Sequence, residues 1–254
     1  MKRFISNKKT LIVLGIIFIF LIWFLISLIF DEYSIIFPSP IKTIKRSIEI
    51  LSTSYVYECL LASFIKMIIG FVIAFILALI FGIISGNNKS FKIFLNPLIT
   101  TLKSIPTAAL VFLFLVITGA TNTPIMMVIL ISFPILYESV VAGFSNIDKE
   151  IIDTIRIDTN NSFLSTFYVK LPMSLSYIIV GIASSFALSF KIEIMSEIIT
   201  GSTRSGLGSA IMTYQRNDPT DMTSILAFSF IAIIFILIVS FICKFAVKKI
   251  SFVK

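Results

Sequence analysis

The stretch NIDKEIIDTIRIDTNNSFLSTFYVKLPMSLSYIIVG, residues 146–181, is the longest polar interruption in the second half of an otherwise apolar chain. A helical period of 3.6 residues places Ile147, Ile151 and Ile155 on one face of a first helix. The other faces carry acidic side chains, namely Asp148, Glu150, Asp153 and Asp158. The first half of the stretch is therefore predicted to be an amphipathic helix with one apolar face.

The second half of the stretch predicts another, shorter helix. Residues 159–162, TNNS, are typical of a turn. Phe163 and Phe167 follow one helical turn apart, and Leu171-Pro172 is expected to close the helix just before a new apolar run. The stretch is thus expected to fold as a helix, a turn and a second helix.

Such a hairpin, of about 30 residues, is too small to bury a core of its own. It also carries too many charges to enter lipid. The pattern alone leaves two interpretations open. The hairpin is either a docking surface for another protein, or a helical loop that lies on the membrane surface or on the rest of its own chain.

The composition of the whole chain indicates a membrane protein. Of its 254 residues, 57% are hydrophobic and 13% are charged, whereas a water-soluble domain carries about 25% charged residues. Several uncharged stretches approach or exceed the roughly 18 residues needed to cross the hydrocarbon core as a helix. These long runs differ from the short alternating strands of a membrane barrel. The predicted fold class is an all-α integral membrane protein.

About six transmembrane helices are expected, with the polar hairpin between spans four and five. The spans cover residues 11–30, 61–84, 93–117 (interrupted by Lys103 and Pro106), 125–141, a core at 175–190, and 222–243. Pro40 is well placed to begin a helix, and the isoleucine stripe of residues 41–51 predicts an amphipathic helix in the membrane interface. The expected division is residues 1–60, with the first span and this outer helix, and a core domain of residues 61–254, with the loop at 146–172.

The distribution of Lys and Arg predicts the orientation. With the N-terminus in the cytoplasm, 13 of the 21 basic residues lie in inside segments and 5 in outside segments. The remaining three, Lys66, Lys103 and Lys191, lie within or beside spans. Both termini and the hairpin are then cytoplasmic, and the Gly- and Ser-rich residues 201–221 lie outside. The net charge of +8 reflects this orientation and not nucleic-acid binding, because the basic residues do not cluster with aromatics on one face.

Enzyme chemistry has little support in the sequence. The chain has no histidine, the commonest general base and zinc ligand. Cys59 and Cys243 are far apart and match no metal spacing, so both are expected to be ordinary thiols in apolar sites. Residues 86–90, GNNKS, lack the glycine directly before the lysine and the preceding strand of a phosphate loop. No catalytic residue, metal or cofactor is expected, and the chain is not expected to hydrolyse ATP itself.

A short helix, a turn, a second helix and Leu171-Pro172, followed nine residues later by Gly181, resemble the coupling loop of ABC-importer permeases. The first half departs from that family. Residues 153–155 are Asp-Thr-Ile where the family tends to have Glu-Ala-Ala, and Thr159 stands at a turn glycine. Arg156 fits a basic position of the family. The resemblance implies an ATPase-docking surface that includes Glu150, Asp153, Thr154, Arg156, Thr159, Pro172 and Gly181.

Four further segments resemble one branch of these permeases, the nitrate/sulfonate/taurine type, which also includes permeases for thiamine-precursor-like compounds. They are FPSP at 37–40, SFIKMIIG at 63–70, KSIPTAAL at 103–110, and Glu197 followed by SGLG at 205–208. Five motifs in the right order are fairly specific and together cover most of the chain. By this resemblance the pore or gate residues are Lys103, Pro106, Glu197, Gly206 and Gly208.

The resemblance implies a permease subunit of the bacterial inner (plasma) membrane that works as a pair, and the expected pair is a homodimer. ATP hydrolysis is expected on a partner chain. Cytoplasmic ATP-binding subunits would dock on the hairpins, and an extracellular or periplasmic substrate-binding protein would deliver the cargo. The expected cargo is a small anionic solute such as a sulfonate or nitrate. The alternative is a thiamine-precursor-like or other small organic solute. A stand-alone secondary carrier would be expected to show an internal sequence repeat, and none is seen.

Several charged residues carry two interpretations each. Lys103 is either a pore-facing cation that favours anionic cargo, or a lysine that pairs with a carbonyl or carboxylate or reaches the inner surface. Lys66 is expected to extend its amine toward the outer end of its span. Glu193 and Glu197, one turn apart, are either solvated charges of the outer loop or part of a gate.

Two further expectations concern helix geometry. Pro106 and Pro134 are expected to kink their helices. Gly82 and Gly86, four residues apart, predict a close contact with a neighbouring helix.

Overall fold

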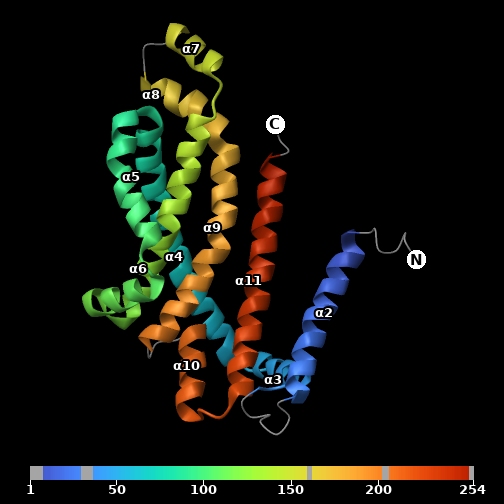
Figure 1. Cartoon of the computed structure of the whole chain (residues 1–254). Coiled ribbons are helices and arrows are strands. Elements are labelled where there is room, and N and C mark those ends of the chain that lie inside the picture. Colours follow the sequence, from blue (N-terminus) through green and yellow to red (C-terminus); the bar gives the residue numbers. More distant parts are fainter. Residues whose placement is uncertain (1–7, 30–36, 159–161, 202–205, 252–254) are drawn as a thin grey trace. The chain divides into compact units, whose positions relative to one another are not determined.

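The computed structural model describes residues 8–29, 37–158, 162–201 and 206–251. The regular elements within these ranges are all helices (Figure 1). Within these ranges, five helices are long and apolar enough to cross a membrane: α2 (Lys8–Ile29), α4 (Ser54–Asn87), α6 (Thr107–Ser145), the helical run Phe163–Thr200, and α11 (Met222–Ser251). The predicted class, an all-α membrane protein with about six spans, is confirmed.

The predicted third span differs from the structure. Residues 93–117 do not form one helix, because α5 (Lys89–Ser104) ends before Ile105 and α6 begins at Thr107. The residue before a proline is driven out of the helical region, and Ile105 is accordingly extended, with φ −72° and ψ 131°. Pro106 therefore separates two helices as the N-cap of α6, and the expectation that it kinks a single helix is wrong.

A second break divides α6 itself. Gly119 has φ 74° and ψ 166°, a backbone conformation that favours glycine. The part of α6 before Gly119 runs across the direction of the rest of the helix (Figure 1). The remainder of α6 corresponds to the predicted fourth span.

The described residues fall into two compact units, of which the first comprises residues 1–58 and 210–233. Within it, α3 (Pro40–Leu51) begins with Ser39 as N-cap and Pro40 in the first turn, as expected. Its buried face packs on the start of α11, where Arg46 Nε donates to Ser224 Oγ at 2.9 Å. The predicted isoleucine stripe lies on the opposite, exposed face. This placement suits a helix with one face toward lipid.

The second unit comprises residues 59–209 and 234–254, and its centre is the contact of α4 and α6 with α9 (Leu171–Thr200). Close approach depends on glycines. A Cβ on Gly82 would lie 2.6 Å from Val140 Cβ, and one on Gly86 would lie 2.6 Å from the Phe144 ring, which confirms the predicted close contact. Gly181 of α9 lies equally close to Ser139 of α6. Small residues thus let the three helices pack backbone to backbone.

The hairpin lies at one end of this second unit (Figure 1). It consists of α7 (Lys149–Asp158), α8 (Ser162–Ser165) and a π-helical turn, η2 (Thr166–Lys170), which runs directly into α9. The expectation that Pro172 closes the second helix is wrong. Proline is tolerated in a first helical turn, and the π-helical turn shifts the hydrogen bonding so that Leu171 N–H donates to Thr166 O.

Candidate functional site

A buried ion pair lies near the C-terminal end of α9. The Glu197 carboxylate is completely buried, and its Oε1 accepts a hydrogen bond from Lys66 Nζ of α4 at 2.5 Å. Its Oε2 accepts from Ser63 Oγ and from Gly208 N–H, both at 2.9 Å. The Lys66 side chain is only 14% exposed. Three donors therefore hold one buried carboxylate, as a buried charge requires.

The turn at residues 206–208, which opens α10 (Leu207–Asn217), is built around this carboxylate. Leu207 N–H donates to Ser63 Oγ at 2.8 Å, so the serine links the turn to Glu197. A Cβ on Gly206 would overlap the Glu197 carboxylate, and one on Gly208 would lie 2.5 Å from Ile194 O. Both glycines are needed because the backbone approaches α9 too closely for a side chain. We call Ser63, Lys66, Glu197 and residues 206–208 the Glu197 cluster.

The Glu197 cluster decides between the sequence interpretations of these charges. The interpretation of Glu193 and Glu197 as solvated charges of the outer loop is wrong, because both side chains are 0% exposed. The Lys66 amine is bound by Glu197, and its extension toward the outer end of the span stays a prediction. Ser63 and Lys66 are three residues apart on α4 and so share a face. That spacing was the available signal for their common partner.

Lys103 lies in the last turn of α5 and forms an ion pair with Glu138 of α6. Its Nζ donates to both carboxylate oxygens, at 2.8 and 2.9 Å, and both side chains are 49% exposed. Of the two interpretations of Lys103, the structure agrees with the second, in which the lysine pairs with a carboxylate. The pair is electrically neutral, so Lys103 brings no uncompensated positive charge to this surface.

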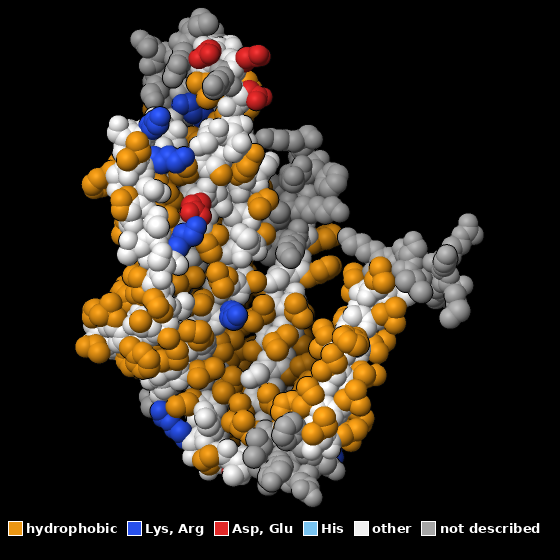
Figure 2. Space-filling view, viewed as in Figure 1, with side chains coloured by type: hydrophobic (Ala, Val, Ile, Leu, Met, Phe, Trp, Pro, Cys, Tyr) orange, Lys and Arg blue, Asp and Glu red, His pale blue; other side chains and the backbone are white. Residues whose placement is uncertain are grey.

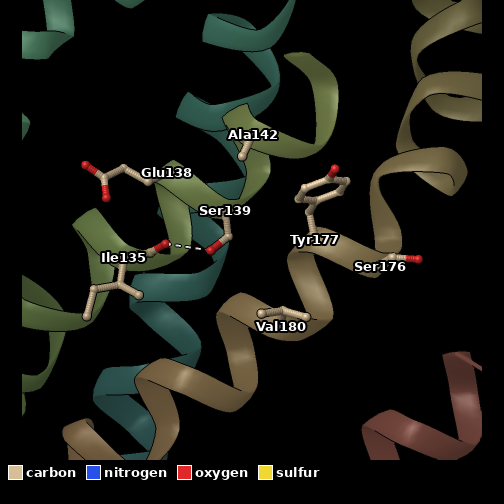
Figure 3. Close-up of a pocket in the computed structure, with 7 residues that line it drawn as sticks. All are labelled: Ile135, Glu138, Ser139, Ala142, Ser176, Tyr177 and Val180. Carbon is tan, nitrogen blue, oxygen red and sulfur yellow. Dashed lines mark hydrogen bonds between the residues drawn. The ribbon is translucent and has the colours of Figure 1, made fainter. Parts of the chain in front are cut away.

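Glu138 also lines a cavity of about 650 Å³ between α6 and α9. Figure 3 shows its walls: Tyr177 projects from α9 toward Ala142 of α6, whereas the Glu138 carboxylate points away from α9. Ser139 Oγ donates to the backbone oxygen of Ile135 at 2.8 Å. The cavity therefore has a mainly apolar wall with few polar groups, a composition common in sites for small molecules.

The acidic residues predicted for the hairpin surface are exposed. Glu150, Asp153 and Thr154 all face outward from α7, and acidic side chains gather at this end of the second unit (Figure 2). Arg156 lies in α7 but its side chain is outside the described residues, as is Thr159 altogether. Pro172 is half-buried in the first turn of α9.

Gly181 is separate from that surface. It lies nine residues further along α9 than Pro172, about 14 Å at 1.5 Å per residue, where it is buried against Ser139. Its position serves the contact between α6 and α9.

An aromatic surface on α8 and η2 was not predicted as a unit. Phe163 is 67% exposed and Tyr168 is 76% exposed, with Phe167 beside them. The Phe163 and Phe167 rings lie 4.6 Å apart, centroid to centroid. Lys170 Nζ donates to Asn87 Oδ1 at 2.7 Å and so anchors the hairpin to the end of α4. The one-turn spacing of the two phenylalanines was the signal in the sequence.

Within the described ranges, no group of three or more Cys, Asp and Glu side chains has the geometry of a metal site. The clusters above are instead suited to binding, packing and docking. They lie at the two ends of α9, the hairpin at its N-terminal end and the Glu197 cluster at its C-terminal end.

Comparison with known proteins assigns the chain to a family. Over residues 78–251 it matches the family described as binding-protein-dependent transport system inner membrane component. A protein of Brucella melitensis, provisionally named an ABC transporter permease, is 22% identical over 176 residues, 69% of this chain and 71% of the relative. SsuC of Bacillus subtilis, provisionally named an aliphatic sulfonates transport permease protein, is 23% identical over 187 residues, 73% of this chain and 67% of SsuC.

A shorter match involves the glucose import system permease protein GlcT of Saccharolobus solfataricus. It is 36% identical over 62 residues, which are 24% of this chain and 22% of GlcT. The family match covers more than half of the chain and includes α6, the hairpin and α9. The chain belongs to the inner-membrane permease components of binding-protein-dependent ABC transport systems.

Proposed function

We propose that this permease subunit pairs with a second copy of itself and forms the path of an importer for a small anionic solute of the sulfonate class. A substrate-binding protein delivers the solute from outside. Separate ATP-binding subunits dock on the hairpin from the cytoplasm, where both chain termini also lie. The chain itself contributes the path and the docking surface, and hydrolysis takes place on the partner.

The observation that carries the docking proposal is the aromatic surface on α8 and η2. Phe163 and Tyr168 are largely exposed although they lie in a charged hairpin next to water-facing acids. Exposed aromatic side chains that pack against each other are typical of protein interfaces. The acids of α7 add electrostatic selection of a partner.

The anionic cargo is supported by the relative named for aliphatic sulfonates and by the lysines of the spans. Lys66 is neutralised by Glu197 and Lys103 by Glu138. Lys191 of α9 is exposed, and among the described residues the structure gives it no ion-pair partner. A lysine at this depth is costly unless it faces a water-filled path or a bound anion. We assign Lys191 as the residue that attracts the anion.

The surroundings of Lys191 suit a path. Val180, Ser184 and Ala187 lie on the same face of α9 at helical spacing. Together with Ser240 they line a second cavity of about 330 Å³, and Val180 is shared with the cavity of Figure 3. Small side chains here leave room beside α9 in line with the Lys191 position.

The docking proposal is tested by substituting Phe163→Ala with Phe167→Ala and measuring how much ATP-binding subunit co-purifies with the permease. We expect a loss of at least tenfold, with the permease still inserted in the membrane. Phe94→Ala is the matched control, since Phe94 is an exposed aromatic residue of α5 outside the hairpin. Equal co-purification of both variants would count against docking on this surface.

The cargo proposal is tested by uptake of an alkyl sulfonate in reconstituted importer. We expect Lys191→Gln to lower uptake several-fold and Lys103→Gln to have a smaller effect, because the charge of Lys103 is already compensated. A neutral sugar or a thiamine-precursor-like compound taken up in preference to sulfonate, with Lys191→Gln unaffected, would refute the anionic cargo.

A further inference from the structure

Glu193 is a buried carboxyl group that no contact described above explains. It lies on α9 one turn before Glu197, and its side chain is 0% exposed. Neither of its two oxygens has a hydrogen-bond partner among the described residues. An ionised carboxylate in such a place would be a charge without compensation, which is among the most destabilising features a folded protein can contain.

The charged and polar groups that act on Glu193 are few. Glu197 lies one turn further along the same helix, and the α4 side chains at this site, Ser63 and Lys66, both donate to Glu197. Lys66 cannot compensate a second carboxylate, because its positive charge is matched by Glu197 at 2.5 Å. Ser63 has one hydroxyl hydrogen, which it donates to Glu197. Two ionised carboxylates beside one lysine would leave a net negative charge in a buried site.

We propose that Glu193 is a proton-binding site: it is held as a neutral carboxylic acid, and its O–H donates a hydrogen bond to the Glu197 carboxylate. Glu193 and Glu197 are both fully buried and lie four residues apart on α9, a spacing that makes their side chains neighbours on one helix face. Two ionised carboxylates are both acceptors and cannot bond each other, whereas one proton converts the contact into a hydrogen bond. Lys66, Glu197 and the protonated Glu193 then have a net charge of zero.

The proton also affects the turn at residues 206–208. Glu197 holds that turn through Gly208 N–H, and Ser63 holds it through Leu207 N–H. Loss of the Glu193 proton places a second negative charge beside the Glu197 carboxylate and weakens its fixed geometry. The bound proton therefore stabilises the attachment of the turn to α4 and α9. The proposal predicts that the folded protein is most stable while Glu193 is protonated, and that its unfolding midpoint falls as the pH rises.

Infrared spectroscopy of the full-length protein in lipid nanodiscs tests the proposal. At neutral pH the wild type should show a protonated-carboxyl C=O stretching band that shifts in D₂O and disappears at alkaline pH. Glu193→Gln should lack this band, and Glu58→Gln, which changes an exposed acid of α4, should retain it. A wild-type spectrum without a protonated-carboxyl band at neutral pH would overturn the proposal. This outcome is measured on the wild type alone and does not depend on whether a variant folds.

Thermal unfolding against pH provides the second measurement. The wild-type midpoint should fall by several degrees between neutral and alkaline pH, and the midpoint of Glu193→Gln, which mimics the neutral acid, should fall less. Identical pH profiles would overturn the proposal. So would a midpoint that sodium chloride raises at neutral pH in the wild type but not in Glu193→Gln, because the occupant would then be a metal cation and not a proton.

Discussion

Replacing Glu197 by alanine should destabilise the protein far more than replacing Glu138, although each carboxylate forms an ion pair with one lysine. The difference is burial. The Glu197 carboxylate is 0% exposed and Lys66 is 14% exposed, whereas Lys103 and Glu138 are each 49% exposed. Glu197→Ala removes the buried carboxylate that accepts from Lys66 Nζ and from Gly208 N–H.

The magnitude follows from these exposures. Breaking a buried pair by removing one partner costs about 3–5 kcal/mol. Because Lys66 retains some exposure, the lower end of that range applies, about 3 kcal/mol. At about 2–4 °C per kcal/mol for a chain of this size, the unfolding midpoint should fall by about 6–12 °C. An exposed pair contributes about 0–1 kcal/mol, so Glu138→Ala should lower the midpoint by no more than about 4 °C.

Thermal unfolding of the purified variants in the same detergent, followed by circular dichroism, measures both shifts. A third protein, Glu197→Gln with Lys66→Met, removes both charges and should recover part of the loss, because no uncompensated ammonium remains. Equal shifts in the two alanine variants would refute the reasoning. So would a double variant that is less stable than Glu197→Ala alone.

Three other predictions concern backbone approach and pH. Gly208→Ala should lower the unfolding midpoint, since its Cβ would lie 2.5 Å from a backbone oxygen; the expected cost is about 1–3 kcal/mol by thermal unfolding. Gly181→Ala should reduce stability through Ser139, and Ser139→Gly should restore it in the double variant, as a double-mutant cycle would measure. Hydrogen bonds from Thr220 O–H and N–H lower the pKa of Asp218. The ionised Asp218 therefore contributes to folding stability at neutral pH, and this contribution is lost as the pH falls through the lowered pKa. Asp218→Asn should therefore flatten the acid side of a midpoint-against-pH profile.

Local patterns predicted the elements of the fold well. Long uncharged runs gave the spans, the isoleucine period gave α7, and Pro40 gave the start of α3. The third span was predicted wrongly because hydropathy averages over a window and does not register a break in the backbone. The signal was present in Ile105-Pro106, where the proline restricts its neighbour. Pro172 was wrongly predicted to end a helix because the π-helical turn before it, which lets the helix continue, leaves no periodic pattern in the sequence.

Partners within the site were harder to predict. The sequence brought Glu197, Gly206 and Gly208 together only through a family resemblance, and their contacts with Ser63 and Lys66 span more than 130 positions. Burial of a carboxylate cannot be read from its neighbours in sequence when a distant helix covers it. Lys103 remained open between two roles for the same reason, since Glu138 lies 35 residues away.

The helical backbone continues without a loop from Ser162 to Thr200, through η2 and into α9 (Figure 1). The 30 residues of α9 measure about 45 Å. A tilt of about 5° about the end next to the hairpin would carry the far end through about 4 Å. That excursion exceeds the 2.5–2.9 Å separations at Glu197, so a small rocking of one rod is sufficient to part its carboxylate from α4 and Gly208.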